Sequence, residues 1–117
     1  MVKRWTGPSA TEHRRQAEIA RRLTEIGFAL PGSVTTRSYR CGKANCACHR
    51  EPPRLHGPYT QWTRQVDGRT IHMNLSAEQI EDYAPWLENG ARIHRLVREL
   101  ESLTLGALER DPRFKER

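Results

Sequence analysis

All three cysteines of this 117-residue chain fall within eight consecutive positions, at Cys41, Cys46 and Cys48. Their number is odd and no Cys-x-x-Cys redox pair is present, so a disulfide framework or a redox site fits poorly. Thiolates on one short loop can instead converge on a tetrahedral zinc ion, with bonds of about 2.3 Å. The cluster therefore predicts one structural zinc ion (Zn2+), and unligated buried thiols are the alternative.

Two histidines lie close enough in sequence to supply a fourth ligand. His49 directly follows Cys48, and adjacent residues point apart in an extended chain, so chelation by both would strain the backbone. His56 lies beyond the stiff pair Pro52-Pro53 and is the better candidate. We therefore expect His56 to complete the site, with His49 as the alternative and a water or a partner residue as a third choice. The expected ligand set is Cys41, Cys46, Cys48 and His56.

Strands are predicted on both sides of the cluster. Residues 33–40 are β-branched and aromatic without a helical period, which favours a short strand. Residues 59–66 and 69–75 are two more strands, joined by a tight turn at Asp67-Gly68. Pairing across this turn collects the apolar residues on one face, the expected core side. That face carries Thr60, Trp62, Arg64 and Val66 beside Arg69, Ile71, Met73 and Leu75.

A first helix is predicted over residues 11–28. Thr11 is the expected N-cap, and Ala20, Leu23 and Ile26 form an apolar stripe at three-residue spacing. Gly27 and the pair Pro31-Gly32 should end the helix.

A second helical region is predicted over residues 76–110. Ser76 and Gln79 form a capping-box pattern at its start, and Pro85 should interrupt or restart the helix. Beyond it a seven-residue pattern places Trp86, Asn89, Ile93, Leu96, Leu100, Leu103 and Ala107 on one stripe. We expect this stripe to pack against the first helix and the sheet. Formation of a homodimer through the C-terminal helix is the alternative.

These elements together predict a fold of the α+β class in a single domain, residues 1–117. It consists of an N-terminal helix, a small three-stranded antiparallel sheet with a zinc knuckle-like loop over residues 33–75, and a long C-terminal helix. A composition of 36% hydrophobic and 29% charged residues suits one compact domain. No apolar run is long enough to span a membrane and no signal-peptide pattern opens the chain, so we expect a cytoplasmic protein.

The net charge of +6 is unevenly distributed along the chain. Residues 33–75 carry seven Lys or Arg against Glu51 and Asp67, which gives +5, whereas residues 76–117 carry −2. A basic segment around the cluster would attract a polyanion such as nucleic acid. The expected phosphate-contacting residues are Arg37, Arg40, Lys43, Arg50, Arg54 and Arg64. Gln61, Gln65 and Asn74 on the polar strand face are candidate readers of base edges.

The run Ser38-Tyr39-Arg40-Cys41-Gly42-Lys43-Ala44-Asn45-Cys46-Ala47-Cys48, followed by His56-Gly57-Pro58-Tyr59, resembles a family of small uncharacterised prokaryotic proteins. Members share a CGK-x-(N/G)-C-x-C core, an HGPY segment and a long C-terminal helix. They often accompany transposases or integrases of mobile elements. The resemblance covers roughly residues 32–104. It implies metal binding by the four residues named above and a setting of DNA mobility, with a recombinase or transposase as a partner.

The motifs argue against an enzyme. Three cysteines and a histidine would close a zinc site, whereas hydrolytic zinc enzymes keep an open position for water. No phosphate loop or dinucleotide fingerprint is present. The leading hypothesis is therefore a zinc-stabilised module that binds nucleic acid, with DNA favoured over RNA. The competing hypothesis is a protein interaction adaptor that acts through its C-terminal helix.

Overall fold

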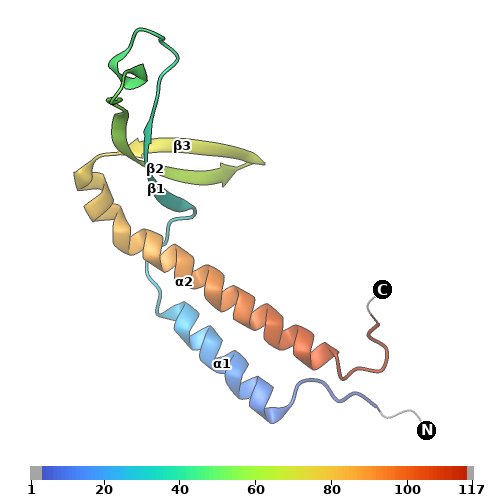
Figure 1. The fold of residues 1–117 in the computed structure, drawn as a ribbon. Coiled ribbons are helices and arrows are strands. Elements are labelled where there is room, and N and C mark those ends of the chain that lie inside the picture. Colours follow the sequence, from blue (N-terminus) through green and yellow to red (C-terminus); the bar gives the residue numbers. More distant parts are fainter. Residues whose placement is uncertain (1–3, 116–117) are drawn as a thin grey trace. The chain divides into compact units, whose positions relative to one another are not determined.

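The computed structural model describes residues 4–115 (Figure 1). Its elements, in chain order, are α1 (Ala10–Thr24), β1 (Ser33–Tyr39), a short 3-10 helix (Ala47–His49), β2 (His56–Val66), β3 (Arg69–Leu75) and α2 (Ala77–Leu108). The expected α+β arrangement is confirmed: an N-terminal helix, a three-stranded antiparallel sheet and a long C-terminal helix. The chain divides into two compact units, residues 30–88 and the segments before and after them, and α2 contributes to both.

The sheet has the order β1-β2-β3, and β2 pairs with β3 in the predicted register. Thr60 lies opposite Leu75 and Val66 opposite Arg69, so the apolar face forms as expected. The turn between them has positive φ at both Asp67 (50°) and Gly68 (78°), the backbone that a tight hairpin requires. Only Leu75 on this face is buried, and Met73 remains 41% exposed. The sheet therefore rests on a thin core.

Trp62 anchors the segment that leads into β1. Its indole Nε1 donates a hydrogen bond to the carbonyl oxygen of Pro31 at 2.8 Å, and the Arg64 guanidinium lies 4.4 Å from its ring centroid. Gly32 has φ +89°, and a Cβ there would lie 2.2 Å from the Thr63 carbonyl oxygen. Only glycine can therefore occupy position 32 without moving the strand.

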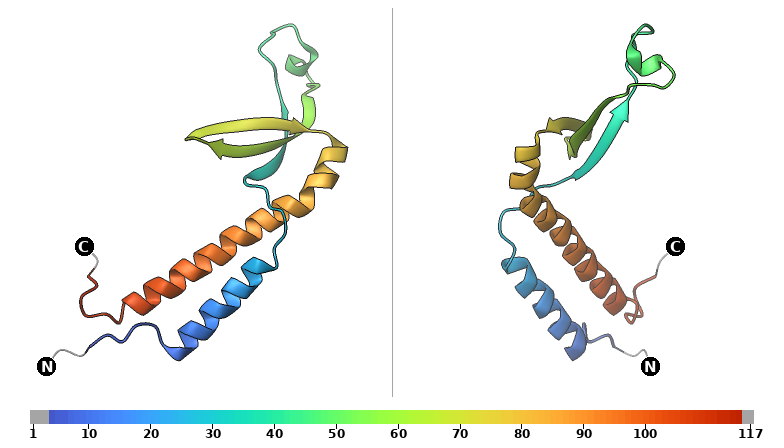
Figure 2. Two further views of the ribbon diagram at one scale, coloured as in Figure 1. Left: turned by 180° about the vertical axis from the view of Figure 1, so that it is seen from behind. Right: turned by 60° about the vertical axis from the view of Figure 1, so that its left-hand side comes forward.

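The segments before residue 30 and after residue 88 form one unit, which we call the helical unit. In it, α1 runs antiparallel to the C-terminal part of α2 (Figure 2). Ile19 from α1 and Leu96 and Ala107 from α2 are buried. The expected stripe residues of α1, Ala20, Leu23 and Ile26, are half-buried, as are Ile93, Leu100 and Leu103 of α2. None of the helices within residues 4–115 combines the length and apolar character that a bilayer crossing requires.

The expected N-cap of α1 was wrong, and so was its C-terminal end. Ser9, not Thr11, caps the helix: the Glu12 amide donates to Ser9 Oγ at 3.2 Å, and the Ser9 amide donates to Glu12 Oε1 at 2.7 Å. This reciprocal pair satisfies two backbone donors, which Thr11 could not do without an acid or amide at position 14. The helix ends at Thr24 rather than at residue 28, before the helix-weakening Gly27.

Pro85 does not interrupt α2, contrary to expectation, because the helix continues from Ala77 to Leu108 with the proline inside it. The missing amide leaves one carbonyl, that of Glu81, without its helical donor. The rings of Tyr83 and Trp86 flank the proline and stack at 6.2 Å with an interplanar angle of 7°. This contact between residues three apart supports the turn that the proline weakens. The capping box of Ser76 and Gln79 is confirmed.

Asn89 occupies one position of the predicted inward stripe, and it ties α2 to the chain that follows α1. Its side-chain Nδ2 donates a hydrogen bond to the carbonyl oxygen of Phe28 at 2.8 Å. A polar residue at this inward position therefore satisfies a backbone acceptor.

The ion pair between Glu12 and Arg110 predicts a stability loss at low pH. Hydrogen bonding to Arg110 and to the Ser9 amide lowers the pKa of Glu12 from 4.5 to about 2. A carboxyl with a depressed folded pKa stabilises the fold above its unfolded pKa, and this contribution disappears as pH falls from 4.5 towards 2. The variant Glu12→Gln keeps the capping-box geometry without the charge. We expect wild type to exceed it in urea midpoint at neutral pH, with the gap closing as pH falls through that window. A gap that is independent of pH would contradict the assignment.

Candidate metal centre

The three cysteines lie on the loop that joins β1 to β2, residues 40–55, which projects beyond the sheet in Figure 1. Cys41 lies two residues after the end of β1, and Cys46 precedes the 3-10 helix that contains Cys48. Short turns hold the loop: the Cys46 amide donates to the Lys43 carbonyl at 3.1 Å, and the Arg54 amide donates to the Ala47 carbonyl at 3.1 Å. His56 is the first residue of β2 and pairs with Tyr39 at the end of β1. The strand ends therefore bring His56 back to the cysteines.

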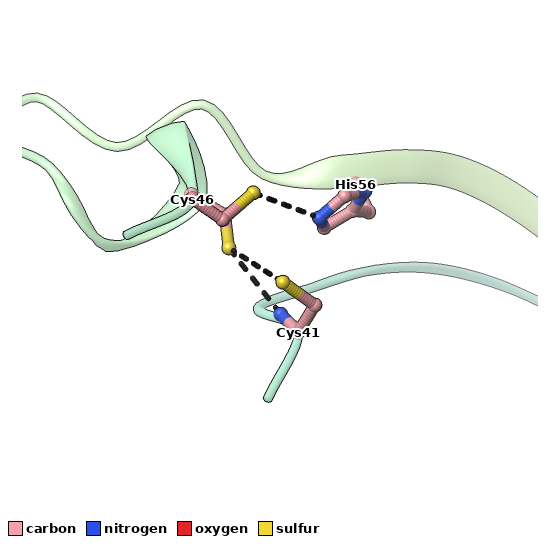
Figure 3. Close-up of side chains that lie close together, drawn as sticks. Cys41, Cys46 and His56 are labelled. Carbon is pink, nitrogen blue, oxygen red and sulfur yellow. Dashed lines mark hydrogen bonds between the residues drawn. The ribbon is translucent and has the colours of Figure 1, made fainter. Parts of the chain in front are cut away.

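The four predicted ligand residues meet in one cluster. One ligand atom from each of Cys41, Cys46, Cys48 and His56 lies within 4.8 Å of all the others, so together they can hold a metal ion. The Sγ atoms of Cys41 and Cys48 are 3.6 Å apart, and Cys46 Sγ lies 3.4 Å from His56 Nε2. Figure 3 shows the Cys46 thiol directed at the imidazole ring. The sequence prediction named the same four residues that the fold brings together.

The surroundings of the cluster shift the thiol pKa values of Cys46 and Cys48 in opposite directions. Hydrogen bonds, above all from the Cys48 backbone amide, lower the pKa of the Cys46 thiol from 9.0 to about 6. Burial raises the pKa of the Cys48 thiol, although the Cys41 amide donates to its sulfur at 3.3 Å. Cys48 is fully buried, whereas Cys41 and Cys46 are partly exposed. A thiolate at Cys46 is therefore available near neutral pH to begin binding a cation.

His49 lies outside the cluster. Its Nε2 is 2.6 Å from the carbonyl oxygen of Cys41, so the ring hydrogen-bonds the backbone of a ligand residue instead of facing the thiols. This contact connects the end of the 3-10 helix to the start of the loop. In this geometry His49 positions Cys41 rather than binding a cation.

Tyr39 packs on the histidine of the cluster, a contact that the sequence interpretation missed. Its ring stacks on His56 with 5.5 Å between centroids, and it also contacts Tyr59 at 5.6 Å. The strand register is irregular between Arg37 and Tyr39, and this bulge allows Tyr39 to pair with His56. A tyrosine two residues before the first cysteine was the available signal. Its stack fixes the imidazole plane facing the thiols.

Gly57 allows the chain to turn from the cluster into the sheet. It has φ +103°, and a Cβ there would lie 2.8 Å from the Arg37 carbonyl oxygen. By contrast, Gly42 within the loop is not in the left-handed region, and a Cβ there would meet nothing within 4 Å. The conformational freedom of glycine is therefore needed beside His56 and not at Gly42.

The predicted phosphate-contacting residues fall into two groups. Arg40, Lys43, Arg50 and Arg54 are exposed on or beside the loop, and Arg37 is exposed on the neighbouring strand. Arg64 instead lies half-buried over Trp62 on the apolar side of the sheet. The register pairs Arg37 with Tyr59, so Arg37 lies on the polar face of the sheet, opposite to the face of Arg64. The structure thus brings five of the six residues to the loop end of the sheet and separates Arg64 from them.

The fold and the cluster define a small α+β protein in which the loop between two antiparallel strands carries a Cys3His cluster that could hold a metal ion. The chain belongs to the family described as Domain of unknown function (DUF6788), which matches residues 10–84 and thus includes all four cluster residues. Neither a curated protein nor a solved structure matches the chain. The family match does not bear on the mobile-element setting, which stays a prediction from the resemblance.

Proposed function

We propose that this protein is a zinc-stabilised nucleic-acid-binding module, with DNA as the favoured target. The zinc ion would hold the loop between β1 and β2, and the basic residues of that loop would contact phosphates. Three thiolates and one imidazole fill a tetrahedral coordination sphere, which supports a structural rather than a catalytic metal. The resemblance to proteins found beside transposases adds an accessory role in DNA mobility to this proposal.

Zinc fits the separations of two pairs of ligand atoms in the cluster. Tetrahedral zinc with bonds of about 2.3 Å to sulfur and about 2.0 Å to nitrogen places two sulfur ligands about 3.8 Å apart and a sulfur and a nitrogen about 3.5 Å apart. The corresponding distances here are 3.6 Å between the Cys41 and Cys48 sulfurs and 3.4 Å between Cys46 Sγ and His56 Nε2. Soft thiolates with an imidazole also favour zinc over the oxygen-seeking cations Mg²⁺ and Ca²⁺.

The observation that carries the nucleic-acid proposal is that the basic side chains at the loop form no ion pairs in the described chain. Within residues 4–115, the ion pairs engage arginines of the helices and of the C-terminal segment, such as Arg22 with Glu18 and Arg110 with Glu12. None of them involves Arg37, Arg40, Lys43, Arg50 or Arg54, which have no carboxylate within 4.0 Å in the described chain. Exposed and uncompensated cations gathered around one loop are suited to phosphate contacts.

The three candidate readers of base edges on the polar sheet face differ in how free their side chains are. Gln65 Nε2 already donates to Thr70 Oγ1 at 2.7 Å, and Thr63 is 2.9 Å from His72 Nδ1 across the same pair of strands. Gln61 and Asn74 lie opposite each other in the register with no hydrogen bond between their side chains in the described chain. These two are therefore the better candidates for adenine contacts.

Charge reversal on the loop tests the proposal. We expect Arg50→Glu with Arg54→Glu to keep zinc and fold and to weaken duplex binding by about tenfold or more at 0.1 M salt. The dependence of log affinity on log salt should flatten by about 0.9 for each phosphate that the variant no longer neutralises. The measurement is fluorescence anisotropy of a labelled duplex at several salt concentrations, with zinc content recorded.

The matched control reverses the same number of charges elsewhere. Arg14 on α1 and Arg69 at the hairpin turn are exposed, and neither residue belongs to the loop. The variant Arg14→Glu with Arg69→Glu should lose much less affinity. Equal losses in the two double variants would show a general charge effect, and an unchanged affinity on reversal of Arg50 and Arg54 would remove the loop as the contact surface.

A specific observation favours one second function, the protein interaction adaptor. Val97 is 39% exposed and Leu105 is 49% exposed on α2, and Leu105 lines an open hollow together with Leu100, Glu101 and Thr104. Apolar side chains exposed along a helix are typical of a surface for a partner helix. If the zinc-loaded protein binds neither duplex nor single strands at low salt, this function replaces the first.

A further inference from the structure

An open groove lined by arginines lies between the two helices of the helical unit. One hollow of about 560 Å³ and another of about 370 Å³ share Arg95 and Glu99 in their linings. The charged residues that line the two hollows are Arg15, Arg22, Arg92, Arg95, Arg98, Glu25 and Glu99. Five arginines against two glutamates give this groove a net charge of +3. We call it the helical groove.

Both glutamates of the helical groove are already paired with arginines of α1. Glu99 accepts from Arg15 at 2.6 Å, and Glu25, just after the helix, accepts from Arg21 at 2.7 Å. Arg92, Arg95 and Arg98 of α2 have no carboxylate within 4.0 Å in the described chain. Three like charges on adjacent turns of one helix repel one another. An anion bound in the groove would relieve this repulsion.

The distribution of these cations fits an extended anion better than a compact one. Arg92, Arg95 and Arg98 follow one another at three-residue intervals, so they span about 9 Å along the helix axis. That span equals the axial rise of two to three nucleotides of one strand, at about 3.4 Å each. Leu96 and Leu103 also line the hollows, and the arginines lie along them instead of converging on one point. Arginine, with its planar set of donors, suits bidentate contact with phosphate oxygens.

We propose that the helical groove is a second phosphate-binding surface for the nucleic-acid backbone, formed by Arg92, Arg95 and Arg98 together with Arg15 and Arg22 of α1. This inference rests on the proposed function for its ligand class. It adds a surface on a different unit of the chain, one that contains no residue of the metal loop. The two surfaces would make separate contributions to affinity and to its salt dependence.

Neutralisation of the groove tests the inference. The variant Arg92→Gln/Arg95→Gln/Arg98→Gln removes three charges from exposed helix positions with a residue of similar helix propensity. We expect duplex affinity to fall by roughly tenfold to a hundredfold at 0.1 M salt, and the salt slope to flatten by about 0.9 for each phosphate no longer neutralised. The matched control Arg4→Gln/Arg14→Gln/Arg69→Gln removes three charges outside the groove and should change affinity by less than about threefold.

The outcomes separate this inference from the proposed function. If the groove variant binds like the control while reversal of Arg50 and Arg54 weakens binding, the groove inference is wrong and the loop proposal stands. If the groove variant alone is weak, the helical groove is the contact surface and the loop proposal is wrong. If the wild type binds no nucleic acid at low salt, both are wrong, and binding of polyglutamate through these arginines would then identify an acidic protein partner.

A second measurement distinguishes contact between these arginines and the duplex from an indirect effect of the triple substitution on affinity. The side-chain Nε–H signals of Arg92, Arg95 and Arg98 can be followed by NMR while a short duplex is titrated into the zinc-loaded wild type. We expect these signals to shift with the same dissociation constant as the anisotropy curve. Signals that stay unchanged at saturation would overturn the inference, whatever the affinity of the triple variant.

Discussion

Replacement of Cys46 by serine is expected to abolish stoichiometric zinc binding and to unfold the loop between β1 and β2. Between Arg40 and Leu55 only Cys48 is buried, so the loop has almost no hydrophobic core of its own. We therefore expect metal binding to supply most of its folding free energy, since apparent values for structural zinc reach about 10–16 kcal/mol in small peptides. Wild type should contain one zinc per chain.

Zinc content by atomic spectroscopy and amide hydrogen exchange of residues 40–58 measure this effect. The control is Ser38→Ala, which alters an exposed strand residue outside the cluster and should retain the metal. A metal-free wild-type preparation with the same loop protection and the same cooperative melting temperature would contradict the zinc assignment.

His56→Ala should reduce zinc affinity far more than His49→Ala. Loss of His56 removes one of the four ligand atoms and opens the coordination sphere to water, so we expect a decrease well above about a hundredfold. The His49 ring contacts the Cys41 carbonyl oxygen rather than the thiols, and removal of such an outer contact typically costs about 10- to 100-fold at most. Competition with a chromophoric chelator measures both affinities. The reverse order would assign His49 as the ligand, and two equally small effects would require a ligand from elsewhere.

The sheet could be predicted in detail because local signals agreed. Asp67 and Gly68 adopt the positive φ angles that their residue types suggest, and this turn fixes the register of β2 and β3. Once the register is fixed, alternation assigns each side chain to a face. The pairing of β1 with β2 then follows from the loop, since the cysteines must return to His56.

The start of α1 and the course of α2 at Pro85 could not be predicted from local residue preferences alone. Ser9 and Thr11 both suit an N-cap, and only the reciprocal bond with Glu12 decides for Ser9. Pro85 usually breaks a helix, but the stacked rings of Tyr83 and Trp86 support the turn around it. Local rules were thus overridden by side-chain contacts that depend on the three-dimensional arrangement.

The helical groove could not be found by dividing charge along the sequence. Residues 76–117 carry −2 in total, yet four of their nine acidic residues fall in the unit of residues 30–88, namely Glu78, Glu81, Asp82 and Glu88. Arg92, Arg95 and Arg98 belong instead to the unit that contains α1 and its arginines. The positive surface therefore arises from two segments far apart in sequence, which no window along the chain would combine.

The affinity of the protein for a labelled duplex, before and after removal of zinc, tests most directly whether the metal centre supports nucleic-acid binding. At about 50 mM salt the zinc-loaded chain should bind, and its affinity should fall steeply as salt rises to about 200 mM. Removal of the metal with a chelator should weaken binding by at least about tenfold, since the basic residues of the loop lose their fixed positions, and added zinc should restore it. Absence of binding by the zinc-loaded protein at the lower salt concentration, or an affinity unchanged by chelation, would contradict this function.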